Sequence, residues 1–171
     1  EGRPTSNLPL RAGKGWLYEG GIREPMIVRW PGEVQAGSVC DEPVISTDFY
    51  PTMLEMADLP SKPEQHVDGR SMTAILKQPG RPAGRAFFWH YPHYGNQGGS
   101  PGGAVRVGDY KMIEFFEDNR VELYNLKTDL GEQHDLASAM PEKIVELKRM
   151  LHEWRAEVGA RMPTPNPNRK E

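Results

Sequence analysis

The clearest pattern of hydrophobic and polar positions lies near the end of the chain. Pro141 suits the first position of a helix, and Glu142 favours the positive end of the helix dipole. Beyond them, apolar residues recur at helical spacing: Ile144, Leu147, Leu151, Trp154 and Val158. The spacing predicts an amphipathic helix whose apolar face packs against a sheet.

Short apolar runs before this helix predict the strands of that sheet. Ala86–Tyr91 is rich in aromatic residues, and residues 103–116 contain two further runs. These two runs are separated by Gly108-Asp109, which fits a two-residue hairpin turn with glycine at its first central position. A fourth run, Val121–Tyr124, follows a polar turn. The pattern indicates an antiparallel meander.

The first half of the chain has shorter apolar segments. Residues 26–30 form an apolar run closed by Pro31-Gly32, which we interpret as a buried strand. Residues 46–58 have apolar positions at helical spacing and predict a short helix. The proline-rich stretch 60–85 is typical of a linker, with a helical turn or two expected over 71–77.

Composition limits the classes of partner. The 171 residues include 37% hydrophobic positions, enough for a real core, and the net charge of -3 gives no broad field that would favour nucleic acid or an anionic membrane. No apolar run approaches the roughly 20 residues that span a bilayer. Cys40 is the single cysteine, which excludes an intrachain disulfide and a cysteine-based zinc site. We expect no nucleic acid and no membrane among the partners.

Lys14 is the first candidate for chemistry. It stands between Gly13 and Gly15, so neither neighbour has a side chain that would keep a ligand from the backbone. The lysine ammonium is a compact charge that suits one oxygen of an anion. Taken alone, the tripeptide is more often a solvated turn than an anion site.

The context of Lys14 resembles the type I, formylglycine-dependent sulfatases. The similarity covers most of residues 8–158 and runs through these segments in order: residues 10–15, Tyr18-Glu19-Gly20-Gly21, Arg23-Glu24-Pro25, Trp30-Pro31-Gly32, Asp48-Phe49-Tyr50-Pro51-Thr52, Asp68-Gly69-Arg70-Ser71, Leu123-Tyr124-Asn125-Leu126 and Asp129-Leu130-Gly131-Glu132. The resemblance implies that the chain is the C-terminal part of such an enzyme. Its opening at Glu1 without an initiator methionine agrees with a fragment of a longer protein.

The resemblance implies a fold and a reaction. The fold would be α/β, the C-terminal part of the alkaline-phosphatase-like sulfatase fold. Residues 1–80 would be the edge of a large mixed-sheet catalytic domain, 81–162 a small antiparallel sheet packed on the C-terminal helix, and 163–171 a flexible tail. The longer protein would hydrolyse aryl or carbohydrate sulfates, with Lys14 contacting the sulfate and stabilising the charge that develops in the reaction.

Other groups of the sulfatase reaction are expected outside this chain. The family's nucleophile is a formylglycine made from Cys or Ser in a Cys/Ser-x-Pro-x-Arg motif, whereas Cys40 precedes Asp41-Glu42-Pro43, so we interpret Cys40 as a buried or half-buried structural residue. The family's divalent metal, usually calcium, is held by acidic residues that none of these residues match. We therefore expect the chain alone to lack both the metal and sulfatase activity, and to depend on a missing N-terminal catalytic domain.

His90 and His93 are candidates for binding the substrate. They lie among tyrosines and next to the glycine-rich stretch 95–103, and such side chains suit sugar recognition by stacking and hydrogen bonding. The alternative is that His90 belongs to the core of the meander while His93 lies in an exposed loop. Two histidines without a third ligand do not predict a metal site.

Two other functions fit the same residues. A phosphoester or phosphonate hydrolase of the same superfamily would also use a lysine near an oxyanion. The second alternative is a binding protein and not an enzyme, namely a non-catalytic carbohydrate-binding subdomain. The absence of the nucleophile motif from these residues is compatible with it. A Cys/Ser-x-Pro-x-Arg motif upstream would favour the enzyme.

Overall fold

A computed structural model describes residues 6–78, 84–164, 166 and 167. The chain forms two compact units: one joins the first 24 residues to the part from Ala86 onward, and the other is Pro25–Arg85. Within the predicted tail, 163, 164, 166 and 167 are exposed and belong to no helix or strand. The rest of that tail, and residues 79–83 of the predicted linker, lie outside the described residues.

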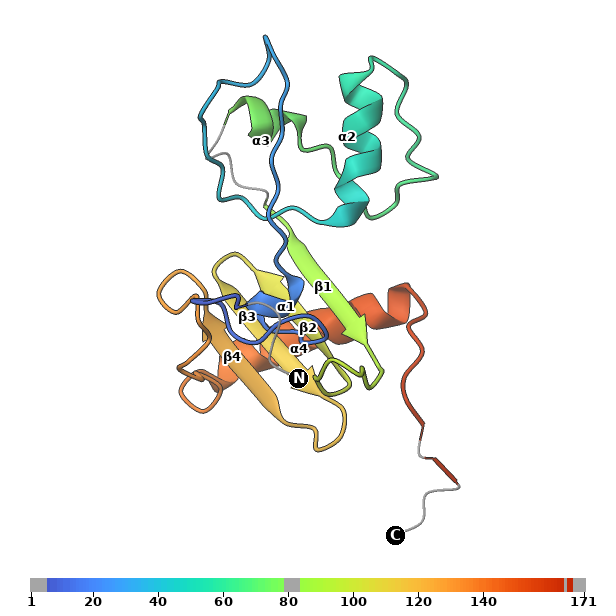
Figure 1. Cartoon of the computed structure of the whole chain (residues 1–171). Helices are drawn as coiled ribbons and strands as arrows, with labels where there is room; N and C mark the ends of the chain where they lie inside the picture. The colour runs from blue at the N-terminus through green and yellow to red at the C-terminus, as the bar shows by residue number, and fades with distance from the viewer. Residues whose placement is uncertain (1–5, 79–83, 165, 168–171) are drawn as a thin grey trace. The chain divides into compact units, whose positions relative to one another are not determined.

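The first unit is built on a four-stranded antiparallel sheet in the order β1-β2-β3-β4 (Figure 1). Its strands are β1 (Ala86–Tyr91), β2 (Gly102–Val107), β3 (Tyr110–Phe115) and β4 (Val121–Asn125). Val107 pairs with Tyr110 across the predicted hairpin turn, and Gly108 has a φ of 57°, a value that suits glycine. The predicted meander is confirmed.

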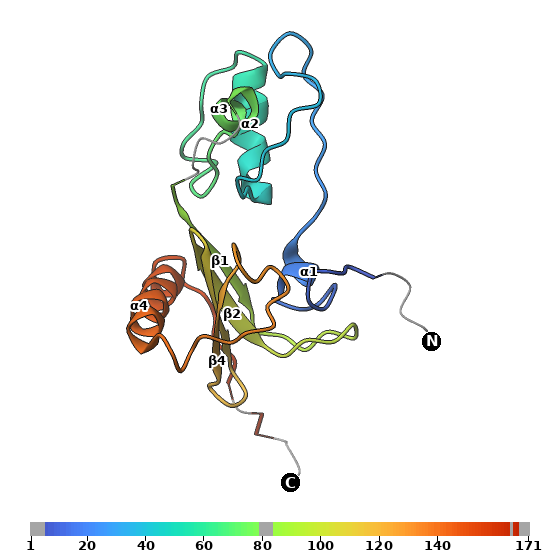
Figure 2. The ribbon, with the colours of Figure 1, turned by 90° about the vertical axis from the view of Figure 1, so that its left-hand side faces the viewer.

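One face of the sheet is covered by α4 (Pro141–Glu157), as the apolar spacing predicts (Figure 2). Leu147 and Leu151 are fully buried in the cluster that this helix forms with the sheet. Val158 was expected on the same apolar face, but it follows the last helical residue and is 46% exposed. The helix ends before its side chain can reach the sheet.

The N-terminal segment covers the opposite face of the sheet (Figure 2). It contains the four-residue helix α1 (Glu19–Ile22). Leu17 and Tyr18 are buried in a cluster with Ala104, Ile113, Phe115, Tyr124 and Leu126. The segment that carries Lys14 is thus fixed to the sheet by packing.

The second unit contains a 3-10 turn and two helices. They are η1 (Ser46–Asp48), α2 (Phe49–Met56) and α3 (Thr73–Lys77), which confirm the predicted helices. Asp48 is buried and accepts hydrogen bonds from the backbone of Ile45 and Arg70, both at 2.9 Å, and it also pairs with Arg85. A Cβ on Gly69 would lie 2.2 Å from the carbonyl oxygen of Thr47. Two of the resemblance-bearing segments are therefore explained by packing within this unit.

The predicted buried strand over residues 26–30 is wrong for this chain. These residues belong to no strand, and Ile27 is 97% exposed. A strand needs a neighbour for its backbone groups, and none of the described strands lies in the second unit. In the part of the chain that the structure describes, no helix is long and apolar enough to cross a membrane.

Candidate functional site

Lys14 lies at the surface of the first unit. Its side chain is exposed and makes no hydrogen bond or ion pair with any described residue. The loop around it is closed by a hydrogen bond from the backbone N–H of Trp16 to the carbonyl of Gly13, at 3.1 Å, and Gly15 has a φ of 94°. Lys14 is therefore a free cation on a defined loop.

A glycine-rich turn packs directly against this loop. A Cβ on Gly99 would lie 2.1 Å from the carbonyl oxygen of Gly15, and one on Gly98 would lie 2.6 Å from the indole nitrogen of Trp16. Both glycines also have positive φ, 81° and 103°. Only residues without a side chain permit so close an approach. The structure thus brings together the two glycine-rich segments that the sequence placed more than 80 residues apart.

The Tyr18-Glu19-Gly20-Gly21 segment is held equally closely. A Cβ on Gly20 would lie 2.4 Å from the carbonyl oxygen of Arg11, and one on Gly21 would lie 2.1 Å from that of Trp16. The side chain of Asn7 donates a hydrogen bond of 2.7 Å to the carbonyl of Gly20. The two glycines let α1 fold back on the chain that leads to Lys14.

A buried ion cluster anchors α1 to the sheet. The Lys111 ammonium lies 2.9 Å from a carboxylate oxygen of Glu19 and 2.9 Å from one of Glu132, and all three side chains are at most 1% exposed. The second oxygen of Glu132 accepts the backbone N–H of Glu19, and the second oxygen of Glu19 accepts Arg23, both at 2.7 Å. Each charge is met by an opposite charge or a hydrogen-bond donor, as buried charges require.

The two carboxyl groups respond differently to the shared lysine. Burial raises the pKa of Glu19, but Lys111 and the additional bond from Arg23 outweigh it and leave that pKa below its ordinary value. For Glu132 burial prevails, so its pKa lies above the ordinary value despite Lys111. The difference follows from the second cation, which only Glu19 contacts closely.

A second cluster surrounds Glu122. Tyr18 and Tyr124 donate hydrogen bonds to the same carboxylate oxygen, at 2.8 and 2.7 Å, and Arg120 pairs with the other oxygen. Arg11 donates to the Tyr124 hydroxyl at 2.9 Å and lies 3.9 Å from the centre of the Tyr18 ring. Burial raises the pKa of Tyr124 to about 12. Both hydroxyls are therefore neutral donors near pH 7, and the cluster is structural.

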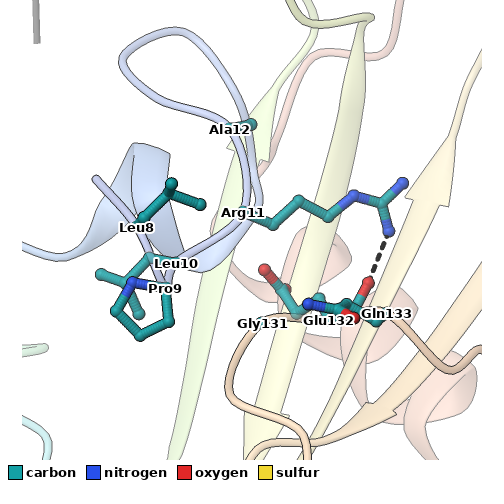
Figure 3. A pocket seen from close by; sticks show the side chains of 8 residues that line it. All are labelled: Leu8, Pro9, Leu10, Arg11, Ala12, Gly131, Glu132 and Gln133. Atoms are coloured by element: carbon teal, nitrogen blue, oxygen red, sulfur yellow. Dashed lines mark hydrogen bonds between the residues drawn. The ribbon is translucent and has the colours of Figure 1, made fainter. Parts of the chain in front are cut away.

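A pocket opens beside Arg11 on the same side of the unit (Figure 3). Arg11 crosses it and donates a hydrogen bond of 2.8 Å to the carbonyl of Glu132. The pocket is lined by Leu8, Pro9, Leu10, Arg11, Ala12, Gly131, Glu132 and Gln133. Lys14 is not among the lining residues, and the Arg11 guanidinium in the pocket is engaged with the Glu132 carbonyl and the Tyr124 hydroxyl. The pocket and the cationic loop are therefore separate features.

The two candidate histidines lie in different surroundings. His90 is half-buried, packs against Phe116 with ring centres 5.7 Å apart, and places its Nε2 2.9 Å from the carbonyl oxygen of Arg161. Alternation along β1 puts His90 on the α4 face, because Phe88 stacks on Trp154 of that helix. His93 is exposed beyond the end of β1, edge-on to Tyr91 at 5.4 Å. The structure does not bring His90 and Lys14 together.

Sequence reasoning missed the charged core. In the sequence, Glu19 and Glu132 stand out only as parts of motifs, and Lys111 lies unmarked within the predicted strands of residues 103–116. Their partners lie 92 and 21 positions away along the chain, so no local pattern could reveal the pairing. The one available signal was that a glutamate interrupts an otherwise apolar and glycine-rich motif.

The described residues offer no divalent-cation site. No group of three or more His, Cys, Asp or Glu side chains among them is arranged to hold a metal ion. Cys40 is a free, half-buried cysteine of the second unit. The ligands of the calcium that the resemblance implies are expected outside this chain.

Comparison with known proteins gives a consistent family. Residues 12–157 match the family described as N-sulphoglucosamine sulphohydrolase, C-terminal. A sulfatase of Formosa agariphila is 39% identical over 166 residues, which are 88% of this chain and 30% of that protein. The chain thus spans less than a third of the length of this relative.

Solved structures share the fold. The crystal structure of Ps i-CgsB in complex with k-i-k-neocarrahexaose matches with a TM-score of 0.76 and 29% identity, covering 87% of this chain and 32% of the other. The structure of BT4656 in complex with its substrate D-glucosamine-2-N,6-O-disulfate matches with a TM-score of 0.64 and 26% identity, covering 76% and 27%. Both likenesses extend over the greater part of the chain.

Proposed function

Because the chain belongs to the sulfatase family, as its C-terminal portion with an α/β fold, we propose that the longer protein hydrolyses sulfate esters with Lys14 as a sulfate-binding residue. One observation carries this role: Lys14 is an exposed cation without a partner among the described residues, on a loop fixed by glycine contacts. A cation held in place without a competing ion pair is available to an anionic substrate.

The reaction explains why such a cation is needed. Cleaving a sulfate ester develops negative charge on the transferring group and on the leaving oxygen. A positive charge that is already in position stabilises this charge without reorganising during the reaction. The packing of Trp16, Gly15 and Gly99 supplies the fixed position.

The substrate class we propose is a carbohydrate sulfate. Its support is the complex of BT4656 with a glucosamine disulfate and the exposed loop that carries His93 next to the glycine-rich turn. His93 is the better placed of the two histidines for such a contact. His90 lies on the α4 face, where binding of the same sugar would require a rearrangement of the sheet edge.

The nucleophile, the calcium and most of the catalytic domain are proposed to lie in parts of the protein outside these 171 residues. Of residues 1–80, which the sequence predicts as part of that domain, 1–24 belong to the same unit as the sheet, and we propose that 25–80 complete the domain. This accounts for apolar side chains left exposed in the second unit, among them Ile27 at 97% and Val67 at 82%. The chain alone is accordingly expected to be inactive toward sulfate esters.

The test is a Lys14→Ala substitution in the full-length protein. We expect kcat/KM for 4-nitrophenyl sulfate and for D-glucosamine-2-N,6-O-disulfate to fall by about 100-fold or more, as for removal of a group that stabilises transition-state charge. Lys127→Ala, at an exposed lysine of the turn after β4, is the matched control and should leave turnover unchanged. Unchanged turnover in Lys14→Ala would show that Lys14 does not bind the sulfate. A wild type that hydrolyses the matched phosphate ester faster than the sulfate ester would overturn the sulfatase assignment.

A further inference from the structure

A tight turn beyond β1 places two amide side chains next to the Lys14 loop. The backbone N–H of Gly98 donates to the carbonyl of Gly95 at 3.3 Å, and these two residues also form an isolated bridge. Asn96 and Gln97 are therefore the central residues of the turn, and both are exposed. In Figure 2 the segment between β1 and β2 extends from the sheet toward the side on which α1 lies.

The turn approaches the Lys14 loop through Gly98 and Gln97. A Cβ on Gly15 would lie 3.0 Å from the carbonyl oxygen of Gly98 and 3.5 Å from the Cβ of Gln97. The Cβ of Gln97 thus lies beside the space that a side chain on Gly15, the residue after Lys14, would occupy. Of the two amides at the tip, Gln97 is the one in this position.

The Gln97 carboxamide is free to bind. It makes no hydrogen bond with any described residue, as is also true of Lys14. An amide donates and accepts at once, which matches a sugar hydroxyl, whereas an ammonium suits a sulfate oxygen. A group suited to anions and a group suited to hydroxyls are therefore carried, both exposed, on two loops that pack against each other.

We propose that Gln97 is a substrate-specificity residue whose carboxamide hydrogen-bonds a hydroxyl or ring substituent of the sugar while Lys14 binds the sulfate. This inference rests on the proposed function and adds to it the group that distinguishes a sulfated sugar from a simple aryl sulfate. An aryl sulfate has no hydroxyl for Gln97 to contact. Substrate selectivity, and not turnover in general, is the property that Gln97 controls.

The experiment compares Gln97→Ala with wild type in the full-length protein, using D-glucosamine-2-N,6-O-disulfate, k-i-k-neocarrahexaose and 4-nitrophenyl sulfate. For the sugar that the wild type hydrolyses best, we expect kcat/KM to fall about fivefold to tenfold, the effect of one lost hydrogen bond. For 4-nitrophenyl sulfate the value should stay within about twofold, and the melting temperature should not change. Gln35→Ala, at another exposed glutamine, is the matched control and should affect neither substrate.

The outcomes separate this inference from the function on which it rests. Equal kcat/KM for wild type and Gln97→Ala on every substrate, or an equal loss on sugar and aryl sulfates, would overturn the role of Gln97 while leaving Lys14 and the sulfatase activity intact. A wild type that hydrolyses the aryl ester and neither sugar would also overturn it. The proposed function itself fails if the wild type does not hydrolyse sulfate esters or if Lys14→Ala keeps full turnover. Either result would overturn both proposals.

Discussion

Replacing Lys111 by methionine should cost this fold a large part of its stability. The substitution keeps the volume of the side chain and removes the cation that lies 2.9 Å from both Glu19 and Glu132. Two carboxylates at most 1% exposed would then be left in the core without their shared partner, and of the two only Glu19 would keep other cations nearby, Arg23 at 2.7 Å and Arg106 at 3.8 Å. Removing one partner of a buried ion pair costs about 3–5 kcal/mol, against a total stability of about 5–15 kcal/mol for a typical domain.

Urea unfolding of the 171-residue chain, followed by tryptophan fluorescence, measures this loss. Lys143→Met is the matched control, because its ammonium lies 2.6 Å from Glu146 with side chains 29% and 45% exposed. A surface pair of this kind is worth about 0.3–0.5 kcal/mol. If the two methionine variants unfold at the same urea concentration, the buried cluster does not stabilise the fold as described.

The pH dependence of the Lys111→Met variant gives a second readout. In the wild type the lowered pKa of Glu19 contributes stability that is present above its ordinary value of 4.5 and is lost as the pH falls. The raised pKa of Glu132 acts in the opposite sense, since acid neutralises a charge that burial disfavours. Without Lys111 the pKa values of both carboxyl groups rise. The difference in free energy of unfolding between wild type and Lys111→Met should therefore become smaller as the pH is lowered toward 4.5. A difference that widens on acidification would contradict the reasoning.

Two further predictions concern the clusters around the site. The pKa of Tyr124 is raised from 10.0 to about 12, so the stability that its neutral hydroxyl contributes is full below pH 10 and is lost as the pH rises toward 12. In Tyr124→Phe the free energy of unfolding should therefore fall less steeply over this alkaline range. An equally steep fall in wild type and variant would contradict the role given to the hydroxyl. Gly99→Ala should cost about 1–3 kcal/mol more than Gly108→Ala, because both glycines have positive φ but only the Gly99 Cβ would meet backbone, at 2.1 Å, whereas nothing lies within 4 Å at Gly108. Equal urea midpoints for the two alanine variants would show that the approach to the Lys14 loop is not tight.

Much of the fold was open to prediction because it depends on neighbours along the chain. The apolar spacing after Pro141 predicted α4, and the turn at Gly108-Asp109 predicted the hairpin of β2 and β3. The ordered motifs around Lys14 indicated the family through their resemblance to the type I sulfatases. These features require only periodicity and local backbone geometry.

Tertiary structure alone decided which distant groups meet. The pairing of Lys111 with Glu19 and Glu132, and the contact of Gly99 with Gly15, depend on how the N-terminal segment crosses the sheet. The strand predicted over residues 26–30 was wrong because of a missing long-range partner. An apolar run becomes a strand only when another strand pairs with its backbone groups. The sequence thus determined most of the elements and the identity of Lys14 as the candidate cation. The burial of charges, the face on which His90 lies and the position of Gln97 beside Lys14 follow from long-range packing, which no local pattern encodes.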